Sequence, residues 1–76
     1  MRYTPRAIGE IAKKTRINLD LTQEALAMTA GTGLRFIYDL ENGKPTCEIG
    51  KVLSLLNTLG ITVMLTPPNR VMQDRE

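Results

Sequence analysis

The sequence of 76 residues has no histidine, no tryptophan and a single cysteine, Cys47. Histidine is a common general base and metal ligand, and neither a glycine-rich phosphate loop nor a suitably placed carboxylate pair replaces it here. Cys47 has no evident base to activate it and no second cysteine to pair with, so we expect a small residue in the first turn of a helix. The sequence therefore predicts a protein that is not an enzyme and that has no cofactor and no metal site.

Long apolar runs are also absent, since no stretch approaches the roughly 20 apolar residues that cross a bilayer. Pro5, Glu10 and several basic residues interrupt the N-terminal region, which does not fit a secretory signal. We therefore expect a cytoplasmic protein without a membrane partner. The composition, 42% hydrophobic and 24% charged, is that of one globular domain. A chain this short buries a marginal core, so a homodimer is an attractive source of further burial.

The strongest local signals lie in the segment 21–44, LTQEALAMTAGTGLRFIYDLENGK. Thr22 can cap a short helix over residues 23–29, and Gly31 can adopt the positive φ that ends it. A second amphipathic helix over residues 34–42 follows after a tight turn. Two short helices with this spacing suit a helix-turn-helix that reads the major groove of DNA.

Helical spacing divides the second helix into a face for the core and a face for a partner. Ile37, Leu40 and Glu41 fall on one stripe, which we expect to point inward. The exposed N-terminal positions include Arg35, the best candidate for direct readout, because a guanidinium can fork to both major-groove acceptors of guanine. Gln23 and Lys44 are better suited to phosphates. The candidate DNA-binding residues are Gln23, Thr32, Gly33, Leu34, Arg35, Tyr38, Asp39, Asn42 and Lys44.

A second interpretation of the same pattern stays open at this point. Two short helices joined by glycine also occur in bundles that contact no nucleic acid, and an isolated arginine on a helix is usually solvated. The net charge of +2 and the pI near 9.0 agree with a polyanion partner without requiring one. A pure protein-interaction module is the alternative.

The flanking segments predict two further helices. Thr4 and Pro5 favour a helix over residues 5–18. After Pro45, Thr46 can cap a fourth helix that runs to Gly60 and closes the core. Its expected apolar stripe consists of Ile49, Val52, Leu53, Leu56 and Leu59.

One β-strand is expected after the fourth helix. Residues 61–66, ITVMLT, are rich in β-branched side chains and end at two prolines. A lone strand cannot satisfy its own backbone, so pairing with the same strand of a second subunit is the economical solution. The alternative is an extended tail packed over the fourth helix. We expect a domain over residues 1–66 and a flexible tail over 67–76, with dimerisation through Ile61, Val63, Met64 and Leu65.

The segment 21–44 resembles the Xre/Cro/C1 class of phage-repressor helix-turn-helix domains, and the resemblance extends to Leu59-Gly60. Within that class the chain looks like the HipB-type antitoxins. This finer resemblance rests on the opening Tyr3-Thr4-Pro5, on Lys13 and Arg16 upstream of Thr22-Gln23, and on the terminal ITVML. Together the similar segments cover residues 3–66.

The resemblance implies an all-α, lambda-repressor-like domain of four to five helices, with one C-terminal strand that pairs across a homodimer. It also implies a protein that binds an operator palindrome in double-stranded DNA, represses its own operon and holds inactive a HipA-type serine/threonine kinase toxin, made of one chain or split in two. Arg16 and Glu41 match a pair that is commonly a buried ion bridge in the repressor domains. The runner-up is a stand-alone repressor of phage or plasmid type without a toxin.

Overall fold

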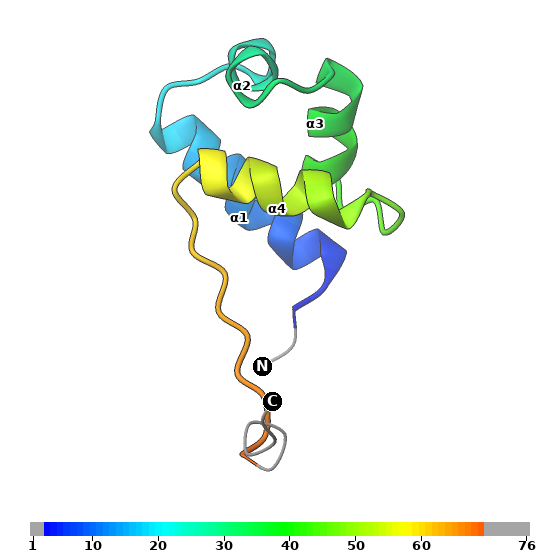
Figure 1. Ribbon diagram of the computed structural model, residues 1–76. Helices are drawn as coiled ribbons and strands as arrows, with labels where there is room; N and C mark the ends of the chain where they lie inside the picture. Colours follow the sequence, from blue (N-terminus) through cyan, green and yellow to red (C-terminus); the bar gives the residue numbers. More distant parts are fainter. Residues whose placement is uncertain (1–2, 70–76) are drawn as a thin grey trace.

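The computed structural model describes residues 3–69 and contains four α-helices in this part of the chain (Figure 1). They are α1 (Pro5–Asn18), α2 (Gln23–Ala30), α3 (Leu34–Glu41) and α4 (Ile49–Thr58). The expected all-α fold is thus confirmed, and the first three helices lie within one residue of their predicted bounds. None of the helices among residues 3–69 combines the length and hydropathy needed to cross a membrane.

Local chemistry sets the starts of the first two helices as the sequence predicts. The hydroxyl of Thr4 accepts a hydrogen bond from the Ala7 N–H at 3.0 Å, and the hydroxyl of Thr22 accepts one from the Ala25 N–H at 3.0 Å. Each bond satisfies an amide of the first turn that has no partner inside the helix. At the other end of α2, Gly31 adopts φ 69°, which fits the left-handed conformation that glycine tolerates best.

The start of α4 differs from the prediction. Thr46 was expected to cap this helix and Cys47 to lie in its first turn, but both residues belong to the preceding loop. The helix begins at Ile49, with Glu48 at its N-cap and no side-chain capping bond. Cys47 is half-buried and packs against the core from the loop. Because the loop directs Cys47 toward the core, the helix starts only after this residue, and Thr46 is too far from the first turn to cap it.

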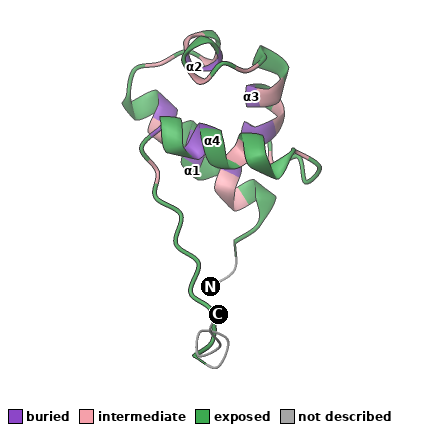
Figure 2. Cartoon of the chain, in the orientation of Figure 1, coloured by how far each residue is buried: buried purple, intermediate pink, exposed green. Residues whose placement is uncertain are grey.

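The hydrophobic core lies where the four helices meet (Figure 2). The stripe on α3 is confirmed, since Ile37, Leu40 and Glu41 are all buried. On α4 the stripe is rotated from its expected position, because Leu55 is buried while Ile49 and Leu53 are exposed. Eight buried hydrophobic residues form the core: Ala12, Leu26, Ala27, Ile37, Leu40, Leu55, Leu56 and Leu59.

Helices α1 and α3 approach each other closely at Gly9. This residue is buried, and a Cβ atom built on it would overlap the Leu40 carbonyl oxygen and press against the Glu41 carbonyl. Any side chain at position 9 would push the two helices apart. The sequence pattern offered no reason to single out Gly9, because the close approach depends on how α1 and α3 pack.

The segment after Gly60 runs away from the helices (Figure 1). The Ile61 N–H donates to the Leu56 carbonyl at 2.9 Å, and residues 62–69 make no further backbone hydrogen bonds within the described part of the chain. Met64 and Leu65 are 80% and 89% exposed, so the segment does not pack over α4. No β-strand is formed among residues 3–69, so the strand expected over residues 61–66 is not present in the single chain, and its pairing across a dimer stays a prediction. Most of the expected tail, residues 70–76, lies outside the described residues.

Candidate nucleic-acid interface

A tight turn of three residues joins α2 to α3. The Thr32 N–H donates to the Ala27 carbonyl at 3.0 Å, which closes the end of α2. Gly33 then serves as the N-cap of α3 with extended backbone, and no side chain caps this helix. The first amides of α3 therefore lack a side-chain acceptor and lie at the positive end of the helix.

Helix α3 has one buried face and one exposed face. Ile37 and Leu40 anchor the buried face in the core. On the other face Leu34 and Tyr38 are exposed, and the side chain of Arg35 is 82% exposed. The helix is thus fixed to the domain by one side and presents a cation, a phenol and an aliphatic side chain on the other.

A charged cluster organises the exposed face of α3. Nε of Arg35 lies 3.1 Å from Oδ1 of Asp39, and Nζ of Lys44 lies 3.4 Å from Oδ2 of the same carboxylate. The guanidinium carbon of Arg35 lies 5.5 Å from the centre of the Tyr38 ring, within the range of a cation–π contact. Asp39 is mostly covered, with a side chain only 15% exposed. Two predicted site residues, Arg35 and Lys44, therefore meet at the carboxylate of a third, Asp39, and a fourth, Tyr38, lies beside Arg35.

The end of α3 involves two further candidates. The Asn42 side chain donates from Nδ2 to the Tyr38 carbonyl at 2.9 Å. The Lys44 N–H donates to the Asp39 carbonyl at 3.0 Å. These bonds satisfy carbonyl groups at the helix end and place Asn42 and Lys44 next to the charged cluster.

Behind this face, Arg16 of α1 and Glu41 of α3 form the predicted buried ion pair. Nε of Arg16 lies 2.6 Å from Oε2 of Glu41, and Nη2 lies 3.1 Å from Oε1. Arg16 also donates from Nη1 to the Leu21 carbonyl at 2.8 Å. The hydrogen bond to Glu41 raises the pKa of Arg16, and the charge of Glu41 acts in the same direction, while burial opposes both.

Gln23 is drawn into this buried network. Its Nε2 donates to Oε1 of Glu41 at 3.0 Å, so the side chain links the start of α2 to α3. The sequence suggested a phosphate contact for Gln23 and did not suggest this structural bond. The side-chain amide thus lies with the ion pair rather than with the Arg35 cluster, and a phosphate contact by this residue stays a prediction.

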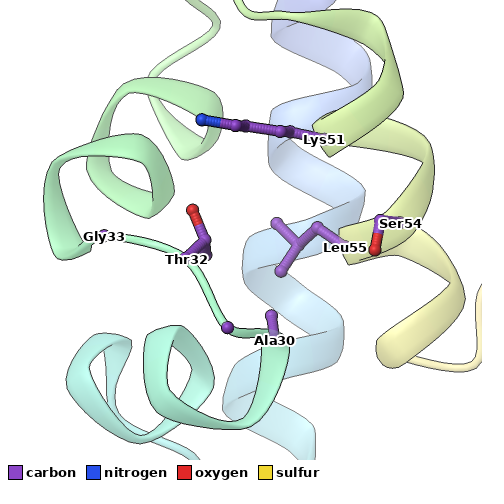
Figure 3. Close-up of a pocket in the computed structure, with 7 residues that line it drawn as sticks. Ala30, Thr32, Gly33, Lys51, Ser54 and Leu55 are labelled. Atoms are coloured by element: carbon purple, nitrogen blue, oxygen red, sulfur yellow. The ribbon is translucent and has the colours of Figure 1, made fainter.

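A cavity of about 330 Å³ lies between the turn and α4. Figure 3 shows Lys51 extending from α4 across this cavity toward α3, with the Thr32 hydroxyl on the same side. Lys51 therefore adds a positive charge near the start of α3. No sequence pattern marks Lys51 as a candidate, because its position depends on how α4 crosses the turn.

Comparison with known proteins places the chain among helix-turn-helix proteins. The family profile described as "Helix-turn-helix domain" matches residues 9–64. An uncharacterized HTH-type transcriptional regulator of Sinorhizobium fredii (strain NBRC 101917 / NGR234), y4mF, is 51% identical over 65 residues, which are 86% of each chain.

Solved structures with a similar fold include HipB in the "HipB-O4 20mer complex" and a chain of the "HipA-HipB-O2-O3 complex". Each is 22% identical with a TM-score of 0.77 and matches 88% of this chain and 94% of the other. At this identity the likeness establishes the fold.

Proposed function

This chain belongs to the Xre-type helix-turn-helix family of transcriptional regulators, and we propose that it is an antitoxin that binds operator DNA as a homodimer and represses its own operon. The observation that supports the proposal most strongly is that α3 has one buried face and one exposed face. Its inner face is locked in the core by Ile37, Leu40 and Glu41, while Arg35 stands 82% exposed on the outer face. A helix held in this way can enter the major groove without unfolding the domain.

The proposed contacts follow from chemistry and position. Arg35 forks to guanine, and Leu34 packs on a thymine methyl group. The Gly33 amide, Asn42 and Lys44 contact phosphates and fix the register of α3 on the duplex. The remaining interface candidates are Gln23, Thr32, Tyr38 and Asp39.

The homodimer is proposed to form through residues 61–66. Val63, Met64 and Leu65 are exposed, and residues 62–66 make no backbone hydrogen bond within the described part of the chain. Pairing of two copies of the segment as a small sheet buries these side chains and satisfies these backbone groups. The residues assigned to this contact are Ile61, Val63, Met64 and Leu65. A two-fold dimer places two α3 helices against two half-sites, so the operator is expected to be a palindrome.

The toxin partner is proposed to be a HipA-type serine/threonine kinase, of one chain or split in two. The support is the likeness of fold to HipB, one solved structure of which is a complex with HipA and operator DNA. The antitoxin acts by binding alone, and the kinase is held inactive in the complex. A stand-alone repressor of phage or plasmid type is the second candidate, favoured by the 51% identical relative, an uncharacterized HTH-type transcriptional regulator.

Affinity capture of the tagged protein from its native cells tests these alternatives, with bound polypeptides and bound DNA both identified. Recovery of a kinase-like protein together with the DNA upstream of the protein's own gene supports the antitoxin. Recovery of that DNA alone favours the stand-alone repressor. Recovery of protein alone contradicts operator binding and leaves a protein-interaction module.

A further inference from the structure

We infer that Asp39 is a positioning residue that orients Arg35 for a guanine at one fixed place in the operator. The inference rests on the proposed function, because it concerns how the exposed face of α3 reads bases. It gives a specific role to Asp39, which the sequence placed only among the candidate DNA-binding residues.

The ion pair between Arg35 and Asp39 leaves the Nη1 and Nη2 edge of the guanidinium free to bind a base. Asp39 faces the Nε side of Arg35 at 3.1 Å. The remaining donors, on Nη1 and Nη2, form the end-on fork that can reach O6 and N7 of guanine together. Among residues 3–69, no protein acceptor forms a hydrogen bond with these two nitrogens of Arg35. The carboxylate therefore holds one side of the group and leaves the reading edge for DNA.

The carboxylate is itself held in place. Its second oxygen, Oδ2, accepts a hydrogen bond from Nζ of Lys44 at 3.4 Å, and the side chain is 15% exposed. Tyr38 supplies a ring surface 5.5 Å from the guanidinium carbon of Arg35. With a fixed carboxylate and a ring beside it, Arg35 loses less conformational freedom when it binds than a solvated arginine does.

The same contacts argue against Asp39 as a direct reader. An aspartate can accept a hydrogen bond from the N4 amino group of cytosine. Here each carboxylate oxygen already faces a cation, and moving it to a base edge would break both contacts. Asp39 is therefore better placed to direct Arg35 than to recognise a base.

The test begins with wild-type protein and a random-sequence duplex library, which define the preferred site and its guanine. Discrimination at that position is then measured for wild type, Arg35→Ala and Asp39→Ala, with the guanine replaced by each other base and by 7-deazaguanine, which lacks the N7 acceptor. Wild type should discriminate by about 5- to 150-fold, the range of a good bidentate contact, and Arg35→Ala should abolish the preference. Asp39→Ala should reduce it at least about threefold and weaken the response to 7-deazaguanine.

Asp39→Ala should also change non-specific DNA affinity, in the direction opposite to its effect on guanine discrimination. It removes a negative charge from the interface, so binding to a duplex without the site should strengthen while guanine discrimination falls. Glu10→Gln makes the same charge change at an exposed position of α1 and should leave discrimination unaltered. Asp39→Asn keeps an acceptor for Arg35 and should retain more discrimination than Asp39→Ala. A merely structural role for Asp39 would not produce this base-specific pattern.

A double-mutant cycle completes the test. Asp39→Ala should have no effect on base preference when Arg35 is already alanine, because the carboxylate acts only through Arg35. Unchanged discrimination in Asp39→Ala, or a further loss of preference in the double variant, would overturn the positioning role. Failure of the wild type to select any sequence is a different result, because it contradicts the proposed function itself. Thermal unfolding of each variant confirms that it is folded.

Discussion

The guanidinium of Arg16 and the carboxylate of Glu41 join α1 to α3 through two contacts of 2.6 and 3.1 Å inside the domain. The pair holds the buried face of α3 against α1, while the opposite face of α3 presents Arg35 to solvent. Gln23 bonds to the same carboxylate, so α1, α2 and α3 all meet at Glu41.

Removing one partner of this pair should strongly destabilise the domain. Arg16→Ala leaves a buried carboxylate without its cation, and we expect the free energy of unfolding to fall by roughly 3–5 kcal/mol in urea titrations. Replacing both residues together, as in Arg16→Met with Glu41→Leu, should cost much less because no buried charge is left alone. Equal losses in the single and double variants would contradict a coupled pair.

The raised pKa of Arg16 contributes stability that is fully present below its unfolded pKa, so we expect loss of this contribution only in strong base.

Gly9→Ala should also destabilise the domain, through backbone contact rather than charge. The added methyl group meets the Leu40 and Glu41 carbonyls of α3, and overpacking of this kind typically costs about 1–3 kcal/mol or more. The matched control is Gly33→Ser, where nothing lies within 4 Å of an added Cβ. Serine caps helices well, so this variant should gain a few tenths of a kcal/mol. If the two variants show the same midpoint in thermal unfolding, the close approach of α1 and α3 is wrong.

Lys44→Ala should weaken DNA binding to an unrelated duplex as well as to the preferred site. A phosphate contact contributes to the salt dependence of affinity, so the slope of log K against log[salt] should decrease in magnitude by about 1. Fluorescence anisotropy at several salt concentrations, on the preferred site and on an unrelated duplex, measures both slopes. Lys44→Arg keeps the charge and should retain the wild-type slope. An unchanged slope in Lys44→Ala would remove this residue from the phosphate contacts.

A chain that ends at Gly60 should be monomeric in light scattering, because it lacks the strand proposed to join the two subunits. The matched control ends at Thr66 and should remain a dimer, since it keeps residues 61–66 and loses only the rest of the tail. Dimerisation of the shorter chain would contradict the intersubunit sheet. Loss of the dimer in the control would assign the contact to residues beyond Thr66.

Local signals explain how much of the fold could be predicted from the sequence. Thr4, Thr22 and Gly31 act on neighbouring backbone groups, so the bounds of α1 and α2 follow from residues within one turn. The spacing of Ile37, Leu40 and Glu41 fixed the orientation of α3 in the same way. At α4 the predicted start was wrong by two residues, because Cys47 packs on the core from the loop, a contact that depends on tertiary structure.

The candidate site was predictable in its residue types and less so in its contacts. Arg35, Tyr38, Asp39 and Lys44 were singled out individually, but their cluster around one carboxylate depends on rotamers that a sequence does not reveal. The bond from Gln23 to Glu41 and the place of Lys51 near the turn depend on packing between helices. Packing between helices therefore accounts for most of the site contacts that the sequence did not predict.

We propose that a homodimer reads a palindrome through its two α3 helices, and selection of duplexes from a random library is the decisive measurement. We expect enriched sites made of two inverted half-sites whose centres lie about one helical turn apart, or a multiple of it, each with a guanine whose preference is lost in Arg35→Ala. Enrichment of single half-sites without symmetry, or no enrichment above a library carried through without protein, would contradict it.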